Sequence, residues 1–139
     1  MAEPQFVHLR LHTEYSLLDS VVRVKALAAR LRELAMPAVA VTDHNNLFAM
    51  VKFYRASLAA GIKPIIGVDL LLRQPDERAA PARFSLLCLD QVGYRNVTRL
   101  VTRAYLEGQQ KGVPLVDRGW LTAESCAGLI ALSGAGEDR

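Results

Sequence analysis

Cysteine is scarce in this sequence, and its two residues, Cys88 and Cys126, are too far apart to form a Cys-x-x-Cys pair. Two isolated cysteines provide no disulfide framework, so we expect buried, reduced thiols and a cytoplasmic protein. Cys88 lies in an apolar segment with no base beside it, which predicts an unreactive thiol.

Long hydrophobic runs are also lacking. No stretch approaches the ~18 apolar residues that a membrane span requires, and the first five residues lack the cationic start and apolar run of a signal peptide. We therefore expect no membrane association. The net charge is only +3, from 17 basic and 14 acidic residues, and so small an excess does not by itself indicate a nucleic-acid-binding surface. Hydrophobic residues make up 51% of the chain, enough for a core.

Three common catalytic or nucleotide-binding motifs are missing. The sequence contains no Gly-x-x-x-x-Gly-Lys-Ser/Thr phosphate loop, no Gly-x-Gly-x-x-Gly fingerprint and no Gly-x-Ser-x-Gly nucleophile elbow. These absences argue against P-loop, Rossmann-type and α/β-hydrolase chemistry. We expect the single tryptophan, Trp120, to be a packing residue rather than a platform for bases.

Apolar segments with strand periodicity alternate with segments of helical periodicity. Strands are predicted over residues 6–12, 38–42, 62–72, 84–89 and 128–133, and helices over 21–34, 47–60 and 93–106. Ser20 is a plausible N-cap and Gly61 a plausible helix terminator. This order predicts an α/β fold with mainly parallel strands and crossover helices. A closed α/β barrel needs roughly 200 residues, so we expect residues 1–139 to form one domain whose barrel is incomplete.

Chemically versatile side chains lie at or near the carboxyl ends of the predicted strands, where the sites of parallel α/β folds form. They are His12, Asp19, Asp43, His44 and Asp69. Imidazole and carboxylate together suit Zn²⁺, Mn²⁺ or Fe²⁺, and such an ion could activate water and bind a phosphate ester. The alternatives are structural: hydrogen-bonded histidines, Asp19 as a turn residue and Asp43 as a helix N-cap.

Arg10 shares the polar face of the first predicted strand with His8 and His12. A guanidinium does not bind a metal, and its charge would repel a divalent ion in a confined site. Arg10 could instead pair with Asp19, Asp43 or Asp69.

Several blocks together resemble the PHP (polymerase and histidinol phosphatase) domain of bacterial replicative polymerases. Residues 6–19, FVHLRLHTEYSLLD, resemble its opening motif, and residues 41–47, VTDHNNL, resemble its second. Further blocks at 61–67, 93–97 and 128–134 continue the similarity in order through nearly the whole chain.

The resemblance implies a distorted seven-stranded (β/α)7 barrel that, in metal-binding members, holds a cluster of divalent ions. The ligand positions that it implies in this chain are 10, 12, 19, 44, 69, 84 and 135. His12, Asp19 and His44 are kept, and Asp69 stands where glutamate is usual. Arg10 and Phe84 replace histidines and Ala135 replaces a cysteine. We therefore expect no tightly bound cofactor and at most a residual Zn, Mn or Mg ion.

The first hypothesis is accordingly a catalytically degenerate PHP scaffold in the α subunit of a replicative DNA polymerase. The resemblance implies that such a scaffold docks the separate proofreading exonuclease subunit, with other replicase subunits and DNA as partners of the parent enzyme. The second hypothesis is an active metal-dependent phosphoesterase or 3′–5′ proofreading exonuclease. A histidinol phosphatase is a third and weaker match.

Overall fold

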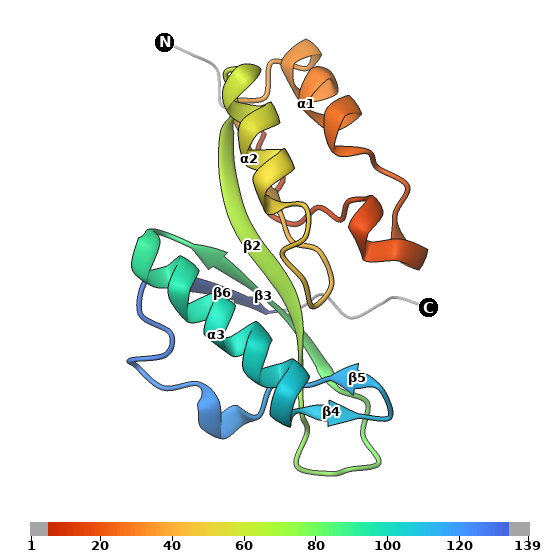
Figure 1. The fold of residues 1–139 in the computed structure, drawn as a ribbon, viewed down its shortest axis with the longest axis vertical. Coiled ribbons are helices and arrows are strands. Elements are labelled where there is room, and N and C mark those ends of the chain that lie inside the picture. The colour runs from red at the N-terminus through yellow and green to blue at the C-terminus, as the bar shows by residue number, and fades with distance from the viewer. Residues whose placement is uncertain (1–5, 134–139) are drawn as a thin grey trace. The chain divides into compact units, whose positions relative to one another are not determined.

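The alternation of apolar and amphipathic segments produces an α/β arrangement, shown for residues 6–133 of a computed structural model in Figure 1. Its elements, in chain order, are η1 (Glu14–Asp19), α1 (Val24–Glu33), β1 (Ala38–Val41), α2 (Met50–Ala59), β2 (Lys63–Leu72), β3 (Ala82–Cys88), α3 (Gln91–Glu107), β4 (Gln109–Gln110), β5 (Val113–Pro114), η2 (Arg118–Trp120) and β6 (Leu129–Ser133). The chain divides into two compact units, Met1–Gly67 and Val68–Arg139.

The first unit contains a parallel β-α-β crossover. β1 is buried along its whole length and pairs in parallel with the start of β2, from Ala38 opposite Lys63 to Val41 opposite Ile66. α2 forms the connection, as the alternating pattern predicts. The predicted α/β class with parallel strands and crossover helices is therefore confirmed.

The segment predicted as the first strand runs beside β1 without becoming a regular strand. His8 forms an isolated parallel bridge with Val39. The Ala40 N–H donates to the His8 carbonyl and the Thr42 N–H donates to the Leu11 carbonyl, both at 2.8 Å. The pairing ends at Thr13 because its N–H donates to the Asp43 carboxylate instead. The strand predicted over residues 6–12 is therefore reduced to an isolated bridge beside β1, and the prediction of a regular strand there was wrong.

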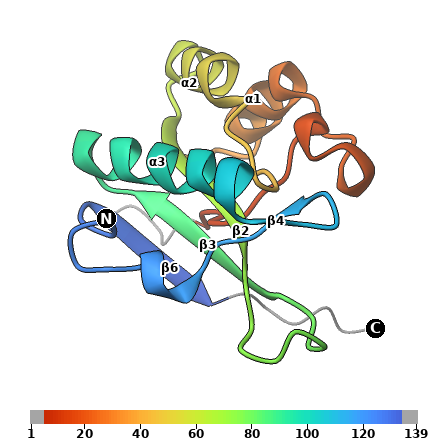
Figure 2. The same ribbon diagram turned by 60° about the horizontal axis from the view of Figure 1, so that its bottom comes forward.

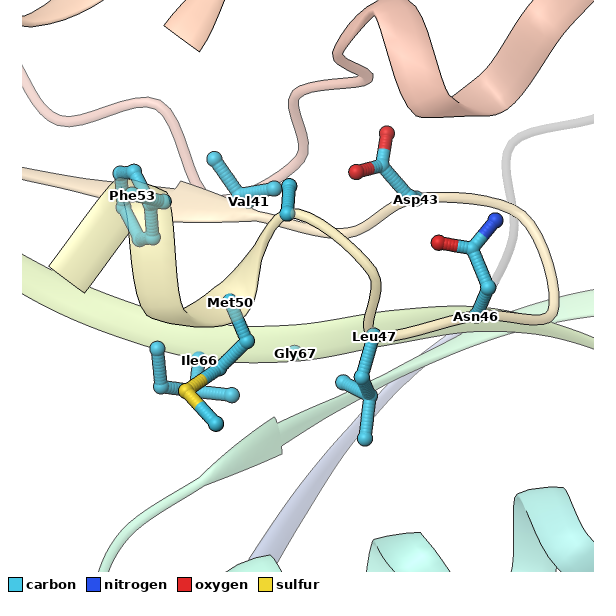
Figure 3. A pocket seen from close by; sticks show the side chains of 9 residues that line it. Val41, Asp43, Asn46, Leu47, Met50, Phe53, Ile66 and Gly67 are labelled. Carbon is cyan, nitrogen blue, oxygen red and sulfur yellow. The ribbon is translucent and has the colours of Figure 1, made fainter.

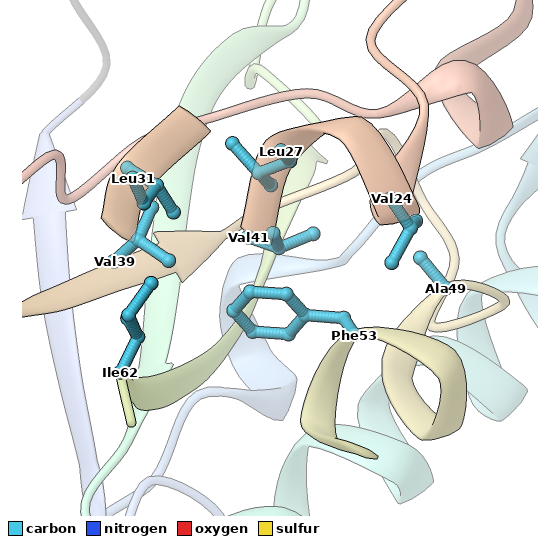
Figure 4. Packing of buried hydrophobic residues seen from close by; sticks show 8 residues of the cluster. All are labelled: Val24, Leu27, Leu31, Val39, Val41, Ala49, Phe53 and Ile62. Carbon is cyan, nitrogen blue, oxygen red and sulfur yellow. The ribbon is translucent and has the colours of Figure 1, made fainter. Parts of the chain in front are cut away.

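α1 and α2 contribute to the apolar core of the first unit. Val24, Leu27 and Leu31 repeat at helical spacing and lie with Phe53 in one buried cluster (Figure 4). Phe53 is only 2% exposed, and burying a side chain of this size contributes about 1.5–3 kcal/mol.

Both helix starts differ from the sequence prediction. α1 begins at Val24 with Arg23 at the N-cap and no side-chain cap, so Ser20 is not its N-cap. The Ser20 hydroxyl instead accepts from the Val22 N–H and donates to the His12 carbonyl over 2.7 Å. α2 begins at Met50, and Gly61 follows its end with φ 74°, the conformation for which glycine was expected there.

In the second unit, β2, β3 and β6 are neighbours in that order, and α3 packs on β3 and β6 (Figure 2). β3 and β6 pair antiparallel, from Phe84 opposite Ser133 to Cys88 opposite Leu129. Residues 108–120, for which the sequence predicts neither helix nor strand, contain the short β4–β5 hairpin and η2. Across residues 6–133, no helix combines the length and the apolar character needed to cross a membrane.

Candidate metal-binding site

Two loops of the first unit bring together His12, Asp19 and His44. His44 Nε2 lies 2.5 Å from Asp19 Oδ2, and the His12 and His44 ring centroids are 4.1 Å apart with their planes tilted by 50°. His44 follows β1, whereas His12 precedes η1 and Asp19 is its last residue, so both lie far from His44 in sequence. Three of the four predicted metal ligands therefore lie in one cluster.

Asp43, next to His44, holds these two loops together. It is 2% exposed, and its carboxylate accepts hydrogen bonds from the Thr13 N–H at 2.6 Å, the Thr13 hydroxyl at 2.7 Å and the Ser16 hydroxyl at 2.6 Å. The interpretation of Asp43 as a helix N-cap is wrong, because α2 begins at Met50 with Ala49 at its N-cap. Asp43 is instead the polar centre that fixes the loops carrying the histidines.

The backbone of His44 is positioned by polar side chains that the sequence did not single out. Its N–H donates to the Ser16 hydroxyl at 3.2 Å, and its carbonyl accepts from Asn46 Nδ2 at 3.0 Å. The same amide nitrogen donates to the Tyr15 carbonyl at 3.0 Å. Thr13, Ser16 and Asn46 are therefore supporting residues of the site; their proximity comes from the meeting of two loops, which no local spacing reveals.

A small cavity of about 10 Å³ lies beside Asp43 (Figure 3). Its lining is mainly apolar and includes Val41, Met50, Phe53 and Ile66. This volume is close to the minimum for a single water molecule. The cavity is therefore a packing gap beneath the loop and not a substrate pocket.

Asp69, the fourth predicted ligand, lies on β2 in the second unit. It is 4% exposed, and the Ser85 hydroxyl of β3 donates to its Oδ1. This hydrogen bond provides a polar partner for a buried carboxylate, which would otherwise be costly to bury.

The three positions predicted to have lost their ligands are distributed along the chain. Arg10 is exposed in the extended segment near the N-terminus, and Phe84 is half-buried in β3, opposite Ser133. Ala135 lies outside the described residues. The pairing of Arg10 with a nearby carboxylate stays a prediction.

The side chains of this cluster are of the types that bind divalent ions in proteins. Two imidazoles and a carboxylate are ligands that suit Zn²⁺ and related ions. Carboxylate–imidazole contacts such as that between Asp19 and His44 also orient histidines around metals. Neither Arg10 nor Phe84 offers a further donor, since a guanidinium does not ligate metals and a phenyl ring has no lone pair.

Comparison with known proteins identifies the fold and the family. The PHP domain family matches residues 8–137. The chain is 52% identical over 132 residues to the DNA polymerase III subunit alpha of Pseudomonas fluorescens, and 42% identical over 134 residues to that of Escherichia coli K12. These alignments cover 95% and 96% of the chain but only 11% and 12% of those relatives, so the chain spans a small part of their length.

Two solved structures share the fold at low sequence identity. One, from Bifidobacterium adolescentis, is described as a metal-dependent phosphoesterase and aligns with a TM-score of 0.57 at 19% identity, over 73% of this chain and 34% of its own. The other, an amidohydrolase from Chromobacterium violaceum, aligns with a TM-score of 0.57 at 18% identity, over 70% of this chain and 32% of its own. The family match covers almost the entire chain, and the chain belongs to the PHP domain family.

Proposed function

We propose that this chain is the PHP domain of a bacterial DNA polymerase III α subunit and serves there as a scaffold, not as a hydrolase. The observation that carries the proposal is the 52% identity to subunits of that name over 95% of the chain. The parent protein would then be a cytoplasmic DNA-directed DNA polymerase, with DNA and the other replicase subunits as partners.

The scaffold role is supported by what stands at the ligand positions that the family resemblance implies. Arg10 and Phe84 supply no lone pair to a metal, and Ala135 has no side-chain donor. Losing even a supporting residue of a metal site costs about 10–100-fold in affinity, so losing three ligands should abolish a multinuclear centre.

The remaining donors would hold at most one weakly bound ion. These donors are His12, Asp19 and His44, with Asp69 as a fourth by its family position. A bound Zn²⁺, Mn²⁺ or Mg²⁺ would supply a Lewis acid for phosphate-ester hydrolysis. In the scaffold, the same residues have a structural role, because Asp19 contacts His44 at its Nε2 and so ties η1 to the loop after β1.

Metal analysis tests the scaffold role. We expect the chain, and a longer polypeptide that completes the barrel, to retain less than one equivalent of transition metal after gel filtration. The triple substitution Arg10→His, Phe84→His and Ala135→Cys in the longer polypeptide should raise the retained metal, and His12→Ala added to it should lower the content again. Two or more equivalents in the unmodified protein, with hydrolysis of 3′ ends, would instead establish the active phosphoesterase.

The docking role needs a separate experiment. We expect the longer polypeptide to co-purify with the proofreading exonuclease subunit of the same organism, and to do so equally well after His12→Ala and His44→Ala. Binding that required both histidines and added Zn²⁺ would contradict a metal-independent scaffold, and failure to bind at all would remove the docking role.

A further inference from the structure

Helix α3 carries a row of exposed arginines in the second unit. Arg95, Arg99 and Arg103 are spaced four residues apart, and each side chain is exposed. Four residues of helix advance about 6 Å, so the guanidinium groups are attached at intervals close to the phosphate spacing of an extended nucleic-acid strand. The net charge of the chain, only +3, gives no indication of this local concentration of positive charge.

Trp120 of η2, predicted from the sequence to be a packing residue, lies against Arg103 of this row. Trp120 is partly buried, and the Arg103 guanidinium carbon lies 4.3 Å from its ring centroid. Arg103 Nε also donates to Glu107 at 2.8 Å, which orients the guanidinium over the indole. Near the protein surface such a cation–π contact is worth only about 0.5–1 kcal/mol.

A cavity of about 230 Å³ lies beside the Arg103–Trp120 pair. Arg99, Arg103 and Trp120 line it together with Asn96, Thr122 and Ser125. Glu124 is the one acidic residue of the lining. The cavity thus presents two arginines, of which Arg103 is ion-paired with Glu107, an aromatic surface and two hydroxyl-bearing side chains to a ligand.

The loop that forms one wall of this cavity is fixed to α3. Asn96 Nδ2 donates to the Glu124 and Ala127 carbonyls at 3.1 and 2.9 Å, and the Ser125 hydroxyl donates to the Trp120 carbonyl at 2.6 Å. The cavity is therefore formed before any ligand binds, which lowers the entropic cost of binding.

We propose that this cavity is a binding site for single-stranded nucleic acid. Arg99 and Arg95 would contact backbone phosphates, and a base would stack on the surface formed by Trp120 and Arg103. Aromatic rings combined with arginines in a groove are the means by which proteins bind single strands without reading sequence. A duplex keeps its bases stacked on one another and would offer no free base to the surface formed by Trp120 and Arg103. The proposal depends on the second unit alone and not on the metal site or the scaffold role.

Because Trp120 is the only tryptophan, its fluorescence reports on the site directly. We expect oligo(dT) of about twelve nucleotides to quench this fluorescence, and a duplex of equal length to bind more weakly. Anisotropy of labelled oligonucleotide should show Trp120→Ala weakening binding roughly 5- to 100-fold, while Trp120→Phe retains most of it. Arg99→Ala should weaken binding and reduce the slope of log affinity against log salt by about 0.7.

Arg55→Ala provides the matched control, because Arg55 is an exposed helical arginine on α2, outside the proposed site. It should change affinity less than twofold. The proposal is overturned if oligo(dT) leaves the tryptophan signal unchanged, or if Arg55→Ala weakens binding as much as Arg99→Ala. It is equally overturned if poly-glutamate competes at the same charge concentration as oligo(dT), since the surface would then select acidic chains and not bases.

Discussion

At the scale of single residues, Asp43 is more important to the fold than the histidines beside it. Its buried carboxylate accepts three hydrogen bonds from Thr13 and Ser16. Asp43→Asn would replace one acceptor oxygen by an NH₂ group, which is itself a donor and would face the donors of Thr13 and Ser16. We expect it to lower the free energy of unfolding by about 2–3 kcal/mol, measured by urea denaturation.

Glu77→Gln, an equally conservative change on an exposed loop, should alter the free energy of unfolding by no more than about 0.5 kcal/mol. Equal stability of the two variants would show that the three hydrogen bonds of Asp43 contribute nothing net to the fold.

Cys88 gives a prediction about pH. Burial, with a smaller effect of Asp90, raises the pKa of its thiol from 9.0 to about 11. The folded protein therefore keeps this proton while the unfolded chain loses it, so stability should fall as pH rises from about 9 to about 11. In a Cys126→Ser variant, alkylation by iodoacetamide should be slow at pH 8 and still be increasing near pH 11.

The control is the same variant unfolded in guanidinium chloride. Its rate of alkylation should reach a plateau at a lower pH than that of the folded protein, because its thiol has the ordinary pKa of 9.0. A native protein that reached its maximum rate by pH 9 would contradict the expected thiol pKa. Slow native alkylation would support the interpretation of Cys88 as an unreactive thiol.

At the scale of elements, the contact between α3 and the chain before β6 decides the effect of a helix glycine. Replacing glycine by alanine within a helix normally stabilises it by up to about 1 kcal/mol. At Gly93, however, an added Cβ would lie 1.9 Å from the Gly128 carbonyl oxygen, and backbone must move to relieve that clash. We expect Gly93→Ala to destabilise the protein by more than about 1 kcal/mol in thermal or urea unfolding.

Thr98→Ala on the exposed face of α3 is the comparison, and it should change stability by less than about 0.5 kcal/mol. If Gly93→Ala raised the melting temperature, then α3 and the Gly128 segment could not be as close as the structure places them.

The elements that depend on local sequence could be predicted, whereas the contacts between distant segments could not. The sequence predicts the buried strand β1, the three helices and the glycine after α2, because apolar periodicity and backbone preference act locally. The proximity of His12 and His44 could be anticipated because sites gather at the carboxyl ends of parallel strands. The Asp43 contacts and the Arg103–Trp120 pair were not found, because they join segments whose proximity depends on packing between distant parts of the chain.

At the scale of the whole molecule, each unit has its own source of stability in protein side chains. The first contains the cluster around Phe53 and the Asp43 hydrogen bonds, and the second contains α3 packed on β3 and β6. A domain held by a structural metal behaves differently, because the free energy of binding the ion is then part of the free energy of folding.

Removal of metal distinguishes these two cases. An ion present at 100 times its dissociation constant would stabilise the protein by about 2.7 kcal/mol, whereas one far below that constant contributes almost nothing. Because His12, Asp19 and His44, clustered within residues 6–67, would hold at most one weakly bound ion, we expect EDTA followed by dialysis to shift the melting temperature by less than about 1 °C. Millimolar Zn²⁺ added back should raise the melting temperature of the unmodified protein and of His8→Ala, but not of His12→Ala. A fall of several degrees with EDTA, reversed by stoichiometric Zn²⁺, would mean that the fold depends on an ion after all.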